Sequence, residues 1–194
     1  MKVGLVDADL LDGGTRHPNL ALLKIAGFLS DNQIPFELIE DENIDIKNYT
    51  RIYVSKVFTF TKEPLFLRNA RKKNNLERIE WGGTGYYGED DPKDVFIKLR
   101  EEDMTKLDND KFLLQFPNHR GGRKMGIDMA HQMPYYDLYR SYIEKKIASG
   151  KNPSYFKDYM NYSIGFLTRG CFRKCPFCVN RLEHRVMPYS KLEW

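Results

Sequence analysis

A chain of 194 residues is long enough to bury one good hydrophobic core and part of a second. Its hydrophobic content of 41% and charged content of 30% are typical of globular proteins, and a mean hydropathy of -0.60 argues against a membrane span. The net charge of +4 lies entirely in residues 163–194, which hold six basic and two acidic side chains, so residues 1–162 are balanced.

The first hundred residues alternate short apolar runs with helical patterns. Pro18 and Asn19 open a helix whose apolar residues recur at helical spacing, and a second helix is expected over residues 64–73. Residues 8–17 are expected to form a polar loop. Because the paths between strands are longer than hairpins, the pattern predicts an α/β fold with a Rossmann-like parallel sheet and crossover helices. Four apolar runs predict its strands: residues 3–6, 36–39, 52–57 and 78–81.

The fourth predicted strand runs into a glycine-rich turn that contains Gly82, Gly83 and Gly85. Such a turn lets the backbone approach a ligand closely, which makes Gly82 and Gly83 candidate cofactor-binding residues. A purely conformational role for the turn is equally frequent. The next helix is expected to start at Asp91 and Pro92.

Residues 106–161 are expected to form a linker that contains a helix. Residues 112–116 predict an edge strand, and residues 118–126 predict a basic loop. An amphipathic helix is expected over residues 135–148, where a dense group of tyrosines is interpreted as packing. Pro153 is expected to end this helical stretch.

All three cysteines lie in one short stretch, at Cys171, Cys175 and Cys178, with the spacing C-x3-C-x2-C. An apolar run at residues 164–167 predicts a buried strand, and residues 168–170 are expected to break it. The thiols are therefore expected on a loop at the carboxyl end of a strand, where parallel α/β architectures place their chemistry. Three thiolates can converge on one soft metal centre, such as an iron–sulfur cluster, zinc or cuprous copper.

This stretch resembles the cluster loop of the radical S-adenosylmethionine (SAM) superfamily. The hallmark of that family is C-x3-C-x2-C with an aromatic residue before the last cysteine, here Phe177. The resemblance implies that Cys171, Cys175 and Cys178 bind a 4Fe–4S cluster, that the open iron binds SAM, and that Phe177 packs beside the adenine. It also implies reductive cleavage of SAM to a 5′-deoxyadenosyl radical and a reductant such as flavodoxin or ferredoxin. A cytoplasmic location is expected separately, because Asp7 and Asp9 interrupt the N-terminal apolar stretch too early for a signal sequence and free thiols require a reducing compartment.

Residues 1–105 resemble the cobalamin-binding-type domain that precedes the barrel in many radical SAM proteins. The runs RHPNLALLKIAGFL, PFELIE and IEWGGTG carry this resemblance. The family signature D-x-H-x-x-G is expected after the first strand. Here Asp7 is followed by Asp9 where the histidine is expected, and His17 is the only histidine nearby. Cobalamin is therefore an open expectation rather than an assigned cofactor.

The resemblance places the start of a radical SAM (β/α) barrel at residues 162–194, so that the chain stops just after the cluster loop. A barrel of this kind needs about 200 residues by the scale of related barrels. We therefore expect the N-terminal part of a longer radical SAM enzyme, inactive by itself, whose substrate the sequence does not identify.

A Rossmann-like binding module with a structural zinc site is the alternative interpretation. His184 follows Cys178 by six positions and can complete a Cys3His tetrahedron. In that case the basic tail is expected to bind nucleic acid. In the radical SAM interpretation the same positive charge compensates the thiolate cluster and the carboxylate of SAM. No membrane partner is expected.

Overall fold

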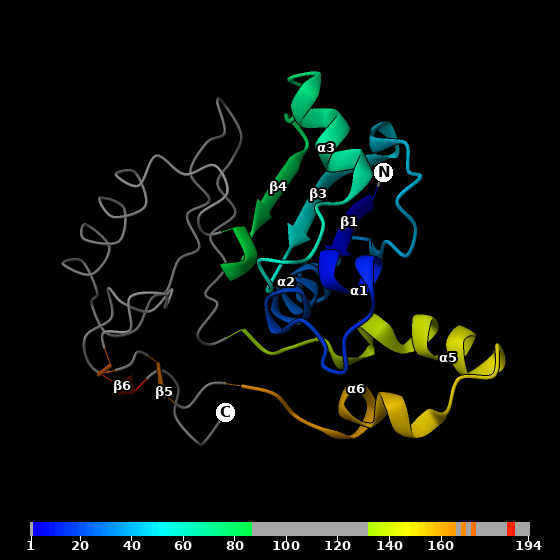
Figure 1. The fold of residues 1–194 in the computed structure, drawn as a ribbon, viewed down its shortest axis with the longest axis vertical. Coiled ribbons are helices and arrows are strands. Elements are labelled where there is room, and N and C mark those ends of the chain that lie inside the picture. Colours follow the sequence, from blue (N-terminus) through cyan, green and yellow to red (C-terminus); the bar gives the residue numbers. More distant parts are fainter. Residues whose placement is uncertain (1, 87–131, 166–167, 170–171, 174–185, 189–194) are drawn as a thin grey trace.

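The computed structural model describes residues 2–86, 132–165, 168–169, 172–173 and 186–188. Four parallel strands form its main sheet in the order β2-β1-β3-β4 (Figure 1). The predicted parallel sheet with helices is thereby confirmed as an α/β fold. Its strands are β1 (Lys2–Asp7), β2 (Phe36–Leu38), β3 (Tyr49–Ser55) and β4 (Ile79–Gly82).

Both faces of the sheet are buried, and successive residues of β1 point to opposite faces. Leu5 packs with α2 (Leu20–Asp31) on one face, whereas Val6 packs with α3 (Leu65–Lys72) on the other. Both side chains are fully buried, as expected for a strand covered by helices on both sides. None of the helices in the described residues is long and apolar enough to cross a membrane.

The expectation of a loop over residues 8–17 is wrong for its first part, because α1 (Ala8–Asp12) follows β1 directly. Asp7 caps this helix: the backbone N–H of Leu10 donates to its Oδ1 at 3.1 Å. An aspartate before a short apolar run is a common helix start. The second helix begins as predicted, because Asn19 Oδ1 accepts a hydrogen bond from the N–H of Leu22 at 3.2 Å.

The segment from residue 132 to 161 packs on the α2 face of the sheet. It contains η3 (Tyr136–Tyr139), α5 (Arg140–Ala148), η4 (Pro153–Phe156) and α6 (Lys157–Asn161). We call residues 132–161 the connector. Leu138, Tyr139, Ile143, Phe156 and Tyr159 share one core with β1 and α2 (Figure 1).

Two details of the connector differ from the sequence prediction. The helix expected over residues 135–148 starts as the 3-10 turn η3 before it becomes α-helical. Pro153, expected to end the helical stretch, instead begins η4, where Asn152 caps the N–H of Ser154 at 2.9 Å. Proline is favoured at the first position of a helix because its missing N–H would have no partner there.

Near the cysteines, Thr168 and Arg169 form β5 (Thr168–Arg169), so the prediction that they break a strand is wrong. The strand β5 pairs antiparallel with β6 (Met187–Pro188). Ile164 and Gly165 are not in a strand, and the rest of that predicted strand lies outside the described residues. The predictions for residues 91–92, 112–116 and 118–126 also lie outside them.

Candidate functional site

The described strands on either side of the cysteines form a bridge between the two ends of the cysteine segment. Thr168 pairs with Pro188, and Arg169 pairs with Met187. This pairing joins the ends of residues 170–186, which contain all three cysteines. The predicted metal and SAM residues themselves lie outside the described part of the chain: Cys171, Cys175, Phe177, Cys178 and His184.

The glycine-rich turn is described, and its geometry explains why it needs glycine. It continues from β4 into η2 (Thr84–Tyr86). Gly83 has a φ of 107°, and a Cβ on it would lie 2.2 Å from the backbone oxygen of Lys56. The N–H of Gly85 donates to the same oxygen at 2.9 Å. The turn therefore folds closely onto the end of β3, and a ligand contact at Gly82 or Gly83 stays a prediction.

The carboxyl ends of β1, β3 and β4 lie at one edge of the sheet, where polar side chains are buried. Asp7, at the end of β1, is 1% exposed. Its Oδ1 caps α1, and its Oδ2 accepts a hydrogen bond from the hydroxyl of Tyr139 at 2.8 Å. Burial raises the pKa of Asp7 from 3.8 to about 6, although the bond from Tyr139 opposes this rise.

The hydroxyl of Tyr139 also reaches the start of α2. It accepts a hydrogen bond from the backbone N–H of Asn19 at 3.2 Å, and Asn19 Nδ2 donates to Ser55 Oγ at 2.8 Å. Burial and the neighbouring charge of Asp7 raise the pKa of Tyr139. Ligands of open α/β sheets bind where the strand order reverses, which here is between β1 and β3. The Tyr139 hydroxyl of the connector is hydrogen-bonded beside that position, at the end of β1.

The carboxylate of Asp9 accepts hydrogen bonds from the loop that follows β3. Its Oδ2 accepts from the N–H of Val57 at 2.7 Å, and its Oδ1 accepts from the N–H of Phe58 at 3.3 Å and from the hydroxyl of Thr61. This carboxylate stands where the cobalamin signature has histidine, and it is buried and committed to these donors. Asp7 and Asp9 therefore do not fit the role of a cobalt ligand, because both carboxylates already accept hydrogen bonds within the protein.

His17 contacts a carboxylate that is distant in the sequence. Its Nδ1 lies 2.8 Å from Asp158 Oδ2, and the imidazole is largely exposed. A carboxylate on one ring nitrogen orients the ring and leaves Nε2 available as a donor or ligand. The pair lines a groove of about 460 Å³ together with Pro18, Tyr162, Ser163, Ile164 and Gly165. The two residues are 141 positions apart, so no local pattern could indicate the pair.

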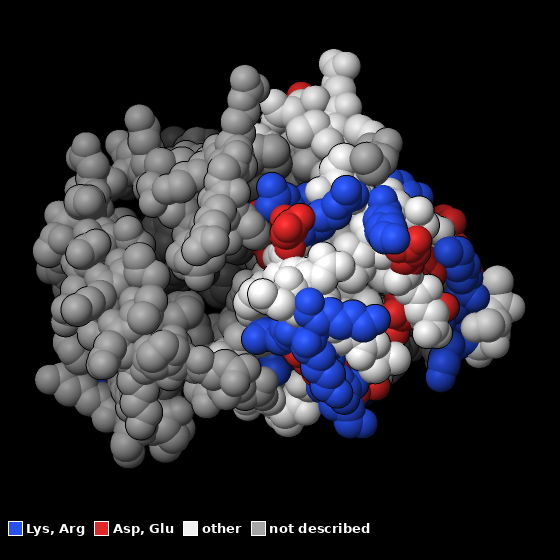
Figure 2. Space-filling view, turned by 90° about the horizontal axis from the view of Figure 1, so that it is seen from above, with Lys and Arg blue, Asp and Glu red and all other residues white. Residues whose placement is uncertain are grey.

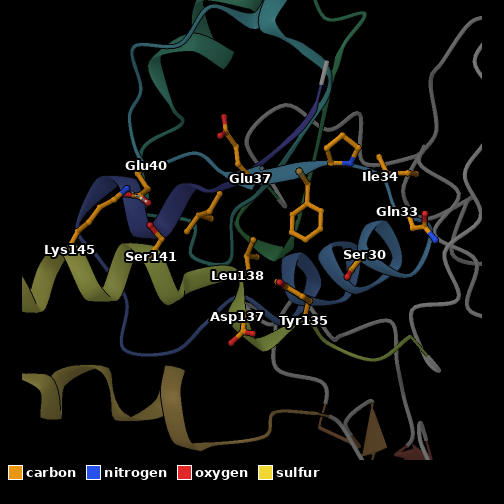
Figure 3. A pocket seen from close by; sticks show the side chains of 13 residues that line it. Ser30, Gln33, Ile34, Glu37, Glu40, Tyr135, Asp137, Leu138, Ser141 and Lys145 are labelled. Atoms are coloured by element: carbon orange, nitrogen blue, oxygen red, sulfur yellow. Dashed lines mark hydrogen bonds and ion pairs between the residues drawn. The ribbon is translucent and has the colours of Figure 1, made fainter.

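A wider hollow of about 630 Å³ lies between the edge strand β2 and the connector (Figure 3). Phe36 and Tyr135 meet edge to face there, with ring centroids 5.4 Å apart. Lys145 reaches Glu40 across the hollow at 3.0 Å, so these charges compensate each other. Together these two residues therefore contribute little net charge that could attract an ionic ligand.

The described residues contain no group of three His, Cys, Asp or Glu side chains that could hold a metal ion. Comparison of the chain with models of protein families, with curated proteins and with solved structures found no match. The cysteine motif and the geometry of the described residues therefore carry the functional argument.

Proposed function

We propose that the chain belongs to a radical SAM enzyme, and that Cys171, Cys175 and Cys178 bind a 4Fe–4S cluster to which SAM also binds. The observation that carries this proposal is the spacing C-x3-C-x2-C with Phe177 directly before the last cysteine. Thiolates are the ligands that iron–sulfur clusters require, and the chain has three of them within eight residues. When bound, the cluster supplies the electron that cleaves SAM.

The residues around the motif support thiolate chemistry. Arg169 and Arg173 each stand two positions from Cys171, and nearby cations favour the deprotonated thiolate that binds metal. The pairing of β5 with β6 supports the same proposal, because joining the ends of a segment reduces the volume that its cysteines can occupy before they bind.

In this proposal the α/β domain, which we interpret as Rossmann-like, is a rigid support for the cysteine segment. The connector leads from the sheet into that segment, and Tyr139 fixes the connector to Asp7 and Asn19 at the carboxyl edge. The α/β domain therefore fixes the position of the connector, from which the chain continues into the cysteine segment. Cobalamin is not part of the proposal, because Asp9 accepts hydrogen bonds from the loop after β3 and Asp7 accepts them from Leu10 and Tyr139.

Anaerobic reconstitution followed by iron, sulfide and zinc analysis tests the ligand set. We expect about four irons and four sulfides per chain. Cys175→Ala should lose the cluster, whereas His184→Ala, the matched control, should keep it. One zinc without sulfide, lost in His184→Ala, would instead establish the Cys3His site and overturn the proposal.

A further inference from the structure

The helix α3 carries a strongly basic outer side. Residues 64–76 contain four basic side chains and no acidic one. Phe66, Leu67 and Ala70 are buried against the sheet, which turns Arg68 and Lys72 outward. Both are exposed, as are Lys73 and the asparagines that flank these cations, Asn69, Asn74 and Asn75.

Of the four basic side chains in residues 64–76, one makes an ion pair in the described residues and three do not. Arg71 Nε lies 2.9 Å from Glu63 Oε1. Its guanidinium carbon Cζ lies over the ring of Trp81, 4.4 Å from the ring centroid. Within the described residues no ion pair is found for the other three cations, Arg68, Lys72 and Lys73. These three exposed side chains therefore make no ion pair with an acidic side chain of the described residues.

The basic surface continues beyond α3 along the amino edge of the sheet. Arg78 donates to the backbone oxygens of Lys47, at 3.3 Å, and Tyr49, at 2.9 Å. These bonds bring η1 (Ile46–Asn48), with the exposed side chain of Lys47, beside the turn that follows α3. Figure 2 looks onto this end of the molecule and shows groups of Lys and Arg side chains with Asp and Glu side chains between them. We define the basic face as Lys47, Arg68, Lys72 and Lys73.

Helix stability does not account for this arrangement. The helix dipole favours cations in the last turn, which explains Lys72 and Lys73 but not Arg68. Arg68 and Lys72 are four positions apart, and like charges at that spacing destabilise a helix. A bound anionic partner would remove this repulsion.

We propose that the basic face binds the phosphate backbone of nucleic acid. Clustered cations on one face are the electrostatic footprint of such binding, and exposed asparagine amides can donate to phosphate and sugar oxygens. An anionic membrane fits less well. Surface helices bind membranes by inserting several apolar side chains, and Phe66, Leu67 and Ala70 of α3 are buried in the core, which leaves Leu65 as the exposed apolar side chain of this helix. This inference is independent of the cysteine motif and of the proposed cluster.

The test is fluorescence anisotropy with the whole chain and a labelled RNA of about 20 nucleotides, single-stranded and as a duplex, at about 50 mM salt. The variant Arg68→Gln, Lys72→Gln, Lys73→Gln removes three cations from the basic face. The matched control removes three exposed cations that lie outside the basic face and make no ion pair in the described residues: Arg16→Gln, Lys151→Gln and Lys157→Gln. Both variants have the same net charge, so a difference between them reports position.

We expect the basic-face variant to bind at least tenfold more weakly and to lower the slope of log K against log salt by about 2, at about 0.7 per lost phosphate contact. The control should retain binding within about twofold. Unchanged melting temperatures would show that both variants are folded. Equal losses in both variants, or no binding by the unaltered chain, would overturn the proposal. Binding to anionic vesicles instead of RNA, lost in the same variant, would assign the face to a membrane.

Discussion

Replacing Tyr139 with phenylalanine tests the contact that fixes the connector to the sheet. The change removes a hydroxyl that donates to Asp7 Oδ2 at 2.8 Å and accepts from the N–H of Asn19 at 3.2 Å. Both partners are buried, so water cannot easily replace the lost hydroxyl. A hydrogen bond to a charged group contributes about 1.5–3 kcal/mol. We therefore expect Tyr139→Phe to lower the free energy of unfolding by about 2 kcal/mol near neutral pH.

The effect should depend on pH because of Asp7. Its pKa is raised from 3.8 to about 6 in the folded protein, so the folded state binds the proton more tightly than the unfolded state. The stability that this protonation contributes is fully present below about pH 4 and is lost as the pH rises through about 6. Two pKa units correspond to about 3 kcal/mol. At low pH Asp7 is neutral, so Tyr139→Phe should cost less there than at neutral pH.

The assay is urea unfolding of the unaltered chain and the variant across this pH range. Tyr142→Phe on α5 is the matched control, because in the described structure its hydroxyl makes no hydrogen bond and it should cost little at any pH. An equal cost for the two variants, or a cost of Tyr139→Phe that does not change with pH, would refute the role assigned to the Asp7–Tyr139 contact.

Three further predictions concern the loops and the core. Asp9→Ala should lower the free energy of unfolding by about 2 kcal/mol and make the loop after β3 more sensitive to limited proteolysis, since it removes the acceptor of three hydrogen bonds. Gly83→Ala should destabilise the chain more than Gly14→Ala in thermal unfolding, because both have positive φ but only Gly83 faces a backbone atom. A chelator should leave the main thermal transition unchanged, since the cores of the described residues contain no cysteine; a collapse of the whole fold would favour structural zinc.

The sequence predicts the strands well because apolar runs report burial directly. The runs at residues 3–6, 36–39 and 78–81 coincide with β1, β2 and β4 to within a few residues. The order of the strands in the sheet follows from long-range pairing, which no local pattern encodes. At Pro153 the local pattern misleads in another way: proline often follows the end of a helix, but here Asn152 caps a new helical turn that Pro153 begins.

The candidate site also contains one part that a local sequence motif predicts and another part that depends on long-range contacts. The cysteine spacing is a local motif, so the sequence alone identifies the predicted ligands. The contact between Asp7 and Tyr139 joins residues 132 positions apart, and Asp9 acts on a loop about fifty positions away. Sequence reasoning compared Asp7 and Asp9 with a cofactor signature, whereas packing shows both carboxylates satisfied within the protein. Only the three-dimensional arrangement separates a structural carboxylate from an available ligand.

Electron paramagnetic resonance of the anaerobically reconstituted and reduced chain tests the central claim most directly. If three cysteines bind the cluster and SAM binds the remaining iron, the reduced chain should show the signal of a 4Fe–4S cluster, and addition of SAM should change it. The signal should be absent from Cys171→Ala, Cys175→Ala and Cys178→Ala. A signal that does not respond to SAM, or a chain that holds zinc and no iron–sulfur signal, would contradict the assignment to radical SAM chemistry.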